Sequence, residues 1–133
     1  MAATSKTSPH RCRDPLKARA VNAPPPASDP SAVRSILSQG LGVLRDRHGI
    51  ERAIRGLYPL ANGHSAAADP ALVGLMIAVA AWRREESRGG HYRSDFPDAL
   101  PSAAPSSISL AATLDAARNI VETGSLSVGS AQP

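Results

Sequence analysis

Cysteine and aromatic residues are scarce in this 133-residue sequence, which has one cysteine, Cys12, and four aromatic side chains. A single cysteine excludes an intramolecular disulfide and any zinc site that needs several cysteines, and it favours a reducing compartment. We therefore expect a cytoplasmic protein. So few aromatic rings leave little to stack on bases, which argues against nucleic-acid binding by a folded domain. No apolar run reaches the roughly 18–20 residues that cross a bilayer, so no membrane partner is predicted.

Large core-forming side chains are also few. Alanine contributes 24 residues, nearly as many as the 26 that Leu, Ile, Val and Phe contribute together. Such a composition allows one small core at most. The net charge of +4 is confined to residues 1–28, which hold five basic residues and one acidic, whereas residues 29–133 hold ten of each. The part of the chain expected to fold is therefore neutral overall.

Residues 1–28 are rich in Ser, Pro, Ala and Arg and show no hydrophobic period. This composition predicts a disordered basic tail, with a targeting extension as the alternative. Apolar residues then recur at helical spacing. Asp-Pro pairs at residues 29–30 and 69–70 are helix-start signals, an acidic N-cap before a proline at the first helical position. The pattern predicts helices over residues 30–46, 50–60 and 70–88.

Breaker residues set the predicted ends of these helices. His48-Gly49 is expected to stop the first helix, Pro59 to end or kink the second, and Gly89-Gly90 to stop the third. A linker rich in Pro, Ser and Ala follows to about residue 107, and a short weak helix is expected from Leu110 to Gly124. The predicted fold is all-α: a small three-helix bundle at residues 29–97, after the tail at 1–28 and before the linker and weak helix at 98–133.

The densest polar stretch follows the most apolar helix, residues 71–82. Eight of its residues, here called the octet, are Arg84, Glu86, Ser87, Arg88, Gly89, His91, Arg93 and Asp95. From composition alone, this stretch reads as a solvated helix end and a charged loop. Helical spacing would put Arg84 and Arg88 on one face. The alternation of His91, Arg93 and Asp95 would put these three on one side of an extended strand.

The octet fills all eight fixed places of the pattern R-x-E-S-R-G-x-H-x-R-x-D. In this it resembles the C-terminal-domain signature of the succinate dehydrogenase/fumarate reductase flavoprotein family, which includes L-aspartate oxidase. Phe96-Pro97 resembles the aspartate oxidase continuation of the signature. Upstream, the segment Gly42–Arg45 resembles the family's G-V-x-R at the end of its first C-terminal helix. The resemblance covers about residues 30–97.

The resemblance implies the C-terminal helical domain of an enzyme that uses FAD to oxidise L-aspartate to iminoaspartate in NAD biosynthesis. It also implies that the octet docks this domain on the flavin domain and is not catalytic, with Arg88 and Arg93 as the preferred anchors. Without that partner, we expect the chain to be marginally stable or to self-associate through the apolar residues 71–82. A stand-alone helical interaction module without enzymatic activity is the alternative, and a binding protein acting through residues 1–28 is a third hypothesis.

No catalytic, cofactor-binding or metal-binding residue is predicted. The nearest match to a glycine-rich phosphate loop is Gly40-Leu41-Gly42, but Arg45 stands where the third glycine should be, and the match lies late in a helix. His91 and Asp95 would supply two metal ligands without a third nearby. We therefore expect this chain alone to bind no FAD.

Overall fold

The computed structural model describes residues 28–128, so all of the predicted basic tail except Ser28 lies outside the described residues. Four helices form within that range: α1 (Ser31–Gly40), α2 (Arg47–Ala61), α3 (Ala68–Arg83) and α4 (Leu110–Val128). The same range contains two isolated β-bridges and no strand. The all-α prediction is therefore confirmed for it. None of these four helices is long and apolar enough to cross a membrane.

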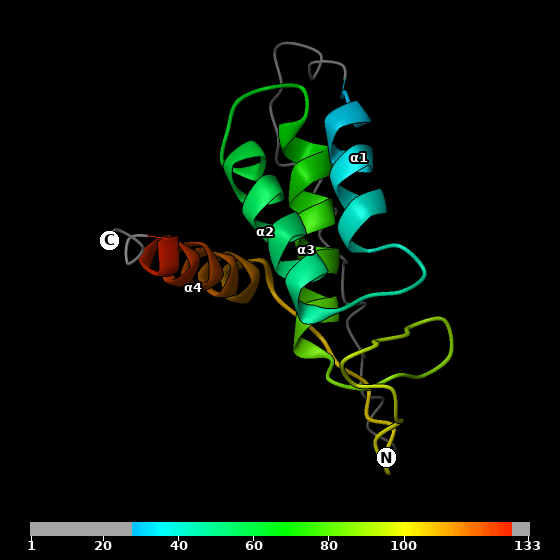
Figure 1. Ribbon diagram of the computed structural model, residues 1–133. Coiled ribbons are helices and arrows are strands. Elements are labelled where there is room, and N and C mark those ends of the chain that lie inside the picture. Colours follow the sequence, from blue (N-terminus) through cyan, green and yellow to red (C-terminus); the bar gives the residue numbers. More distant parts are fainter. Residues whose placement is uncertain (1–27, 129–133) are drawn as a thin grey trace, which may run out of the picture.

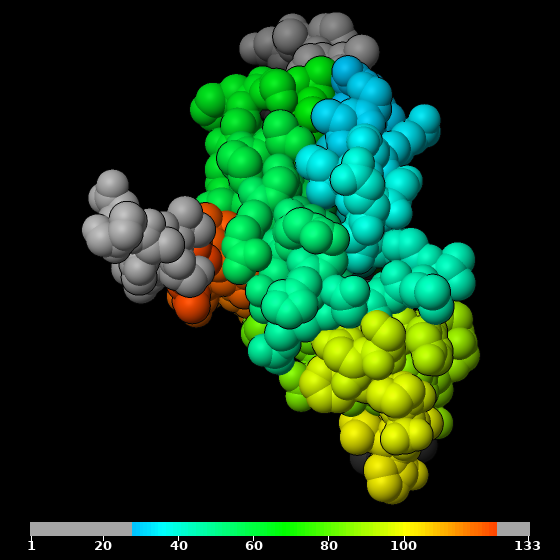
Figure 2. All heavy atoms as spheres, viewed as in Figure 1, coloured from blue at the N-terminus to red at the C-terminus, as the bar shows by residue number. Residues whose placement is uncertain are grey.

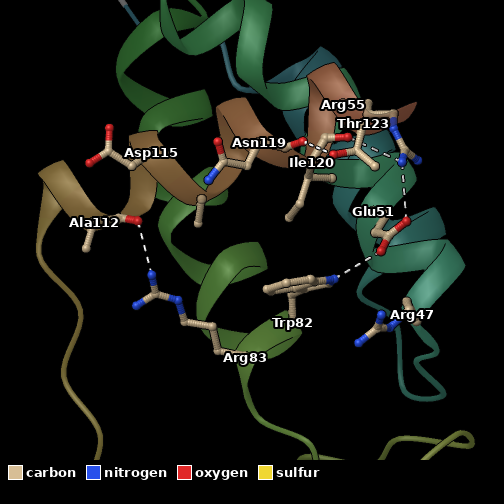
Figure 3. Close-up of a pocket in the computed structure, with 11 residues that line it drawn as sticks. Arg47, Glu51, Arg55, Trp82, Arg83, Ala112, Asp115, Asn119, Ile120 and Thr123 are labelled. Carbon is tan, nitrogen blue, oxygen red and sulfur yellow. Dashed lines mark hydrogen bonds and ion pairs between the residues drawn. The ribbon is translucent and has the colours of Figure 1, made fainter. Parts of the chain in front are cut away.

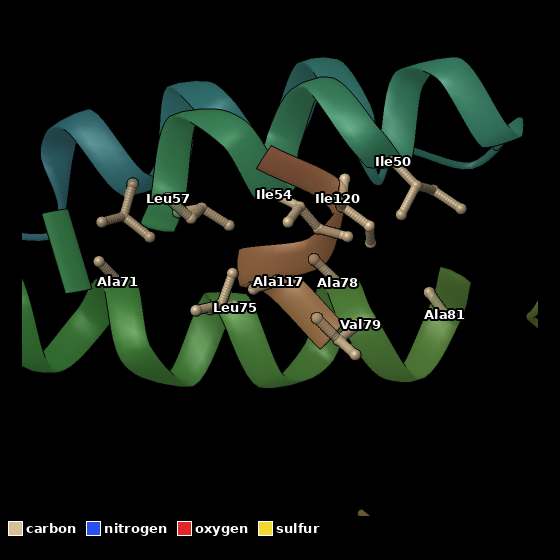
Figure 4. Packing of buried hydrophobic residues seen from close by; sticks show 11 residues of the cluster. Ile50, Ile54, Leu57, Ala71, Leu75, Ala78, Val79, Ala81, Ala117 and Ile120 are labelled. Atoms are coloured by element: carbon tan, nitrogen blue, oxygen red, sulfur yellow. The ribbon is translucent and has the colours of Figure 1, made fainter. Parts of the chain in front are cut away.

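The core lies mainly between α2 and α3, which run side by side (Figure 1). Ile50, Ile54 and Leu57 from α2 are fully buried against the small residues and leucine of α3. The spacing i, i+4, i+7 places all three on one face of α2. Figure 4 shows this row facing Ala71, Leu75, Ala78 and Val79. Burying each of the large aliphatic side chains contributes roughly 1.5–3 kcal/mol, so this interface holds the domain together.

The boundary between the first two helices lies earlier in the chain than predicted. The expectation that the first helix runs to residue 46 and stops at His48-Gly49 is wrong, because α1 ends at Gly40 and α2 already begins at Arg47. The physical reason is Asp46, whose carboxylate accepts a 2.7 Å hydrogen bond from the Gly49 amide and so caps α2. The segment Gly42–Arg45 is therefore a loop after α1 and not the end of a helix.

The second predicted end lies close to the observed one, and the third does not. Helix α2 continues to Ala61, one residue beyond the predicted end at residue 60, and Pro59 lies inside its last turn. A proline in the last turn removes only one backbone hydrogen bond, so the turn persists. Helix α3 ends at Arg83, five residues before its predicted end, because the backbone of Arg84 is extended. The glycine pair after Arg88 therefore does not terminate the helix.

Helix α4 is longer than the weak helix predicted, and it joins the core. It crosses α2 and α3 at a steep angle (Figure 1) and buries Thr113, Ala117 and Ile120. Ser109 caps its start, since the Ser109 hydroxyl accepts a hydrogen bond from the Ala112 amide at 3.2 Å. The packed helical unit thus extends beyond residue 97, where the sequence placed its end.

Gly40 brings α1 into direct contact with α2. A Cβ atom at this position would lie 2.5 Å from the Gly49 carbonyl oxygen and 2.7 Å from the Ala53 Cβ. Both atoms are held by the helix, so we predict that Gly40→Ala lowers the free energy of unfolding by about 1–3 kcal/mol. Gly90→Ala is the matched control, because a Cβ there has nothing within 4 Å. Urea denaturation followed by circular dichroism measures both, and equal stability of the two variants would contradict this packing.

Candidate functional site

The buried guanidinium of Arg93 organises the octet. Its side chain is fully buried, and its Nη1 donates hydrogen bonds to the carbonyl oxygens of Ala81, Trp82 and Arg84 at 3.0, 3.2 and 3.4 Å. These carbonyls lie at the C-terminal end of α3, where the helix leaves its acceptors unsatisfied and carries partial negative charge. Arg93 therefore supplies both the donors and the charge that this helix end lacks.

Asp95 holds the Arg93 guanidinium in a two-point ion pair. Nε of Arg93 donates to Oδ1 of Asp95 at 2.8 Å, and Nη2 donates to Oδ2. Oδ2 also accepts a hydrogen bond from the Arg47 amide at 3.1 Å, so the pair is tied to the start of α2. The hydrogen bond from Arg93 lowers the pKa of Asp95 to about 2. The carboxylate thus stays charged at neutral and mildly acidic pH.

The hydroxyl of Ser87 connects the start of the octet to the backbone near its end. It accepts a 2.8 Å hydrogen bond from the Arg93 amide and donates its one proton to the Phe96 carbonyl at 2.8 Å, with the Arg93 carbonyl as a more distant acceptor at 3.2 Å. The Ser87 amide donates to the Asp98 carbonyl at 3.0 Å. One small side chain therefore fixes three points of backbone around the buried arginine.

Glu86 is buried and binds two arginines. Its carboxylate accepts hydrogen bonds from Nε of Arg84 at 2.9 Å, from Nε of Arg88 at 3.1 Å and from the Leu100 amide at 3.1 Å. Burial by itself raises the pKa of Glu86, but these three donors outweigh it and leave the pKa below its ordinary value. Arg84 and Arg88 thus meet at one carboxylate rather than on a helix face, and the predicted i, i+4 pairing is wrong because α3 has already ended.

His91 joins the octet to the loop after α1. Its Nδ1 lies 2.9 Å from Nη1 of Arg45, and its Nε2 lies 3.3 Å from the Arg84 carbonyl oxygen. An arginine only donates and a carbonyl only accepts, so we assign the neutral tautomer with the proton on Nε2. Burial is the main cause that lowers the pKa of His91, and the positive charges of Arg45, Arg84 and Arg93 lower it further.

The glycine pair forms a tight turn in this segment. The Arg88 amide donates to the His91 carbonyl at 2.8 Å, the His91 amide donates back at 3.1 Å, and Gly89 takes a positive φ of 59°. A side chain disfavours that conformation, whereas glycine adopts it freely. His91 and Arg93 form isolated β-bridges, to Arg88 and to Arg45, but the predicted extended strand does not reach Asp95. There the chain turns, and the Phe96 amide donates to the Arg93 carbonyl at 3.2 Å.

The family model described as the fumarate reductase flavoprotein C-terminal domain matches residues 66–119, which span α3, the octet and the first half of α4. Residues 66–119 are therefore similar to the C-terminal domain of this flavoprotein family.

Curated relatives point to one branch of the family. The chain is 49% identical over 82 residues to the L-aspartate oxidase of Mesorhizobium japonicum, a match that covers 62% of this chain and 16% of the relative. It is 52% identical over 69 residues to that of Agrobacterium fabrum, covering 52% and 13%, and 48% identical over 73 residues to that of Xylella fastidiosa, covering 55% and 14%. The matched segment is thus about a sixth or less of each of these relatives. No solved structure matches the chain.

FAD is the cofactor that the flavoprotein family implies, and the glycine segment nearest in pattern to a phosphate loop does not fit it. Gly40 and Gly42 lie at the C-terminal end of α1, where carbonyl oxygens carry negative charge that repels phosphate. Gly40 is also packed against Gly49, which leaves no space for a ligand. In addition, no group of three or more His, Cys, Asp or Glu residues among residues 28–128 could hold a metal ion.

The octet divides into internal and accessible members. Arg93 and Glu86 are buried, whereas Arg84 and Arg88 keep 41% and 36% of their side chains exposed. Sequence reasoning missed the part that Ser94 plays, since nothing in its spacing marks its 2.8 Å amide hydrogen bond to the Arg45 carbonyl. The docking role of the octet stays a prediction. Because Arg93 is buried, it can contribute to docking only by holding the exposed residues of the octet in position.

The Arg93 contacts predict a large loss of stability on substitution. Arg93→Met keeps much of the volume but leaves Asp95 unpaired and the carbonyls at the end of α3 without donors. We expect the free energy of unfolding to fall by about 3 kcal/mol. Arg118→Met is the matched control, because the exposed Arg118–Asp115 pair at 3.7 Å is worth only about 0–1 kcal/mol. Urea denaturation of both variants tests this, and a loss below about 1 kcal/mol for Arg93→Met would contradict it.

The lowered pKa of His91 predicts acid sensitivity. As the pH falls below the ordinary value of 6.5, the unfolded chain takes up a proton before the folded domain does. Stability is then constant above about pH 6.5 and falls below it, by at most about 1.4 kcal/mol per pH unit. His91→Asn keeps an acceptor for Arg45 and should remove this slope. Urea midpoints measured between pH 8 and pH 5.5 test the prediction, and identical slopes for parent and variant would refute it.

Proposed function

We propose that this chain supplies the C-terminal helical domain of an FAD-dependent oxidase that converts L-aspartate to iminoaspartate. Its partner is the flavin-bearing catalytic domain of the same enzyme, in a longer chain or in trans. The observation that carries the proposal is the complete octet, held in one defined conformation, in a segment 48–52% identical to three L-aspartate oxidases. In this proposal FAD and the substrate bind on the partner, which is supported by the misfit of the Gly40–Gly42 segment to a phosphate.

The docking surface we propose combines the accessible part of the octet with the loop after α1. Val43 and Leu44 protrude from that loop with 84% and 74% of their surface exposed. The loop is held next to the octet by hydrogen bonds from Ser94 to the Arg45 carbonyl. Figure 2 shows the loop and the octet region adjoining at the lower end of the molecule. Two exposed apolar side chains next to a charged segment match the composition of a protein interface, which combines apolar and polar parts.

Helix α3 offers a second apolar surface. Val73 and Ile77 lie one turn apart and are 59% and 53% exposed. They belong to α3, which is the most apolar of the helices and is not fully covered by the rest of the domain. A patch of this kind is covered in an assembled protein more often than it is left in water. In the absence of the catalytic domain, this face is where the chain would self-associate.

The proposal predicts binding to a catalytic domain that lacks its own helical domain. The Mesorhizobium japonicum L-aspartate oxidase truncated before its matching segment is a suitable partner. The full chain should bind it, and Leu44→Asp should weaken binding at least tenfold, because a charge would replace a buried apolar contact. Arg88→Ala should also weaken binding, since an arginine anchors carbonyls and carboxylates in a fixed geometry. Isothermal titration calorimetry measures each affinity.

Two comparisons make the binding experiment decisive. Arg34→Ala, which removes an exposed arginine from α1 on another part of the surface, should bind as the parent does. Aspartate-dependent peroxide production should be absent for the chain alone and should rise when it is added to the truncated oxidase. A parent that fails to bind would favour the alternative of a stand-alone helical module. Parent-like binding by both Leu44→Asp and Arg88→Ala would exclude this docking surface.

A further inference from the structure

A groove lies between α2, α3 and α4, apart from the proposed docking surface. Its volume is about 560 Å³, within the range of roughly 300–1,000 Å³ typical of small-molecule pockets. Trp82 and Arg83 come from the end of α3, Glu51 and Arg55 come from α2, and α4 forms the opposite wall (Figure 3). The groove is thus built from three helices of the same packed unit.

The alanines of α4 account for the open space. Helix α4 contacts the core through Ala117 and Ile120, and Ala112 and Ala116 are among the residues that line the groove. Alanine side chains are short, so they leave open space in a groove that Trp82 also lines. An apolar wall and a flat aromatic side chain favour a flat apolar ligand body.

The charges of the groove favour an anion. Three arginines, at positions 47, 55 and 83, line it against two carboxylates, those of Glu51 and Asp115. Glu51 is already engaged, since it accepts hydrogen bonds from Nε1 of Trp82 at 3.2 Å and from Nη2 of Arg55 at 3.3 Å. Asp115 lies 3.7 Å from Arg118 outside the groove. The lining therefore keeps one more positive than negative charge.

Arg83 is the arginine best placed to bind that anion. Its Nη2 donates to the Ala112 carbonyl at 3.3 Å, which holds the guanidinium at the mouth of the groove. Among the residues that the structure describes, Arg83 has no carboxylate partner, whereas Arg47 pairs with Glu85 and Arg55 with Glu51. A guanidinium has five N–H donors, so donors remain for a ligand carboxylate.

We propose that this groove binds a small aromatic monocarboxylate, with its ring beside Trp82 and its carboxylate on Arg83. Asn119 and Thr123 line the same space and suit a hydroxyl or amino substituent on the ring. This site is independent of the docking surface, because Val43, Leu44 and Arg88 do not line it.

The single tryptophan of the chain makes the site directly observable. Titration of the full chain with 4-hydroxybenzoate should change Trp82 fluorescence in a saturable way, and calorimetry should give the same dissociation constant. The neutral analogue 4-hydroxybenzamide and the non-planar cyclohexanecarboxylate should each bind at least tenfold more weakly. Equal binding of the amide or of the non-planar acid, or no saturable change with 4-hydroxybenzoate, would overturn the proposal.

Substitutions separate Arg83 from a general charge effect. Arg83→Gln should weaken 4-hydroxybenzoate binding at least tenfold, and Arg83→Lys should restore part of the affinity. Arg34→Gln removes one positive charge outside the groove and should bind as the parent does. Far-ultraviolet circular dichroism melts establish that each variant is folded. Parent-like affinity of a folded Arg83→Gln would overturn the assignment.

Discussion

The end of α3 is the constraint on which the rest of the structure depends. A helix that stops at Arg83 leaves carbonyl oxygens without donors inside the protein, and buried acceptors of this kind must be satisfied. Arg93 satisfies them from ten residues further along the chain, and Asp95 neutralises its charge. For the guanidinium to reach the helix end, the intervening chain has to turn sharply, and Gly89 makes that turn with its positive φ. The octet therefore has a structural role: through Arg93, it supplies hydrogen-bond donors to the carbonyl oxygens at the end of α3.

The same solution creates the surface on which the proposed function rests. Because Ser94 and His91 bind the backbone and side chain of Arg45, the segment around Arg93 also fixes the loop that carries Val43 and Leu44. Internal polar contacts therefore hold exposed apolar side chains in place. Such an arrangement suits a domain that docks on a larger partner, since a preorganised surface loses less entropy on binding. The Trp82 groove lies on another side of the unit and depends on the small side chains of α4.

Helices were easier to predict than their ends or the contacts between them. The stripe of Ile50, Ile54 and Leu57 has the 3.6-residue period, so the presence and buried face of α2 follow from the sequence. Its start depends on which of several polar residues caps it, and only the folded chain shows that Asp46 does so. The octet was recognisable as a pattern, but the role of Arg93 was not, because its partners are backbone carbonyls, which have no sequence signature. Helix α4 was underestimated since alanine-rich stretches give a weak periodic signal and gain their stability from tertiary packing.

The hydrogen-exchange rates of the Arg93 and Ser94 amides in the unmodified protein test most directly whether the octet stays closed around the end of α3. The first is bonded to the Ser87 hydroxyl and the second to the Arg45 carbonyl, so each is protected only while the octet is closed around the end of α3. If that closure holds the domain together, both amides should exchange as slowly as the amide of Leu75 in the centre of α3. Exchange of Arg93 and Ser94 as fast as the exposed amides of residues 102–107 would show that the segment opens independently and would contradict the account.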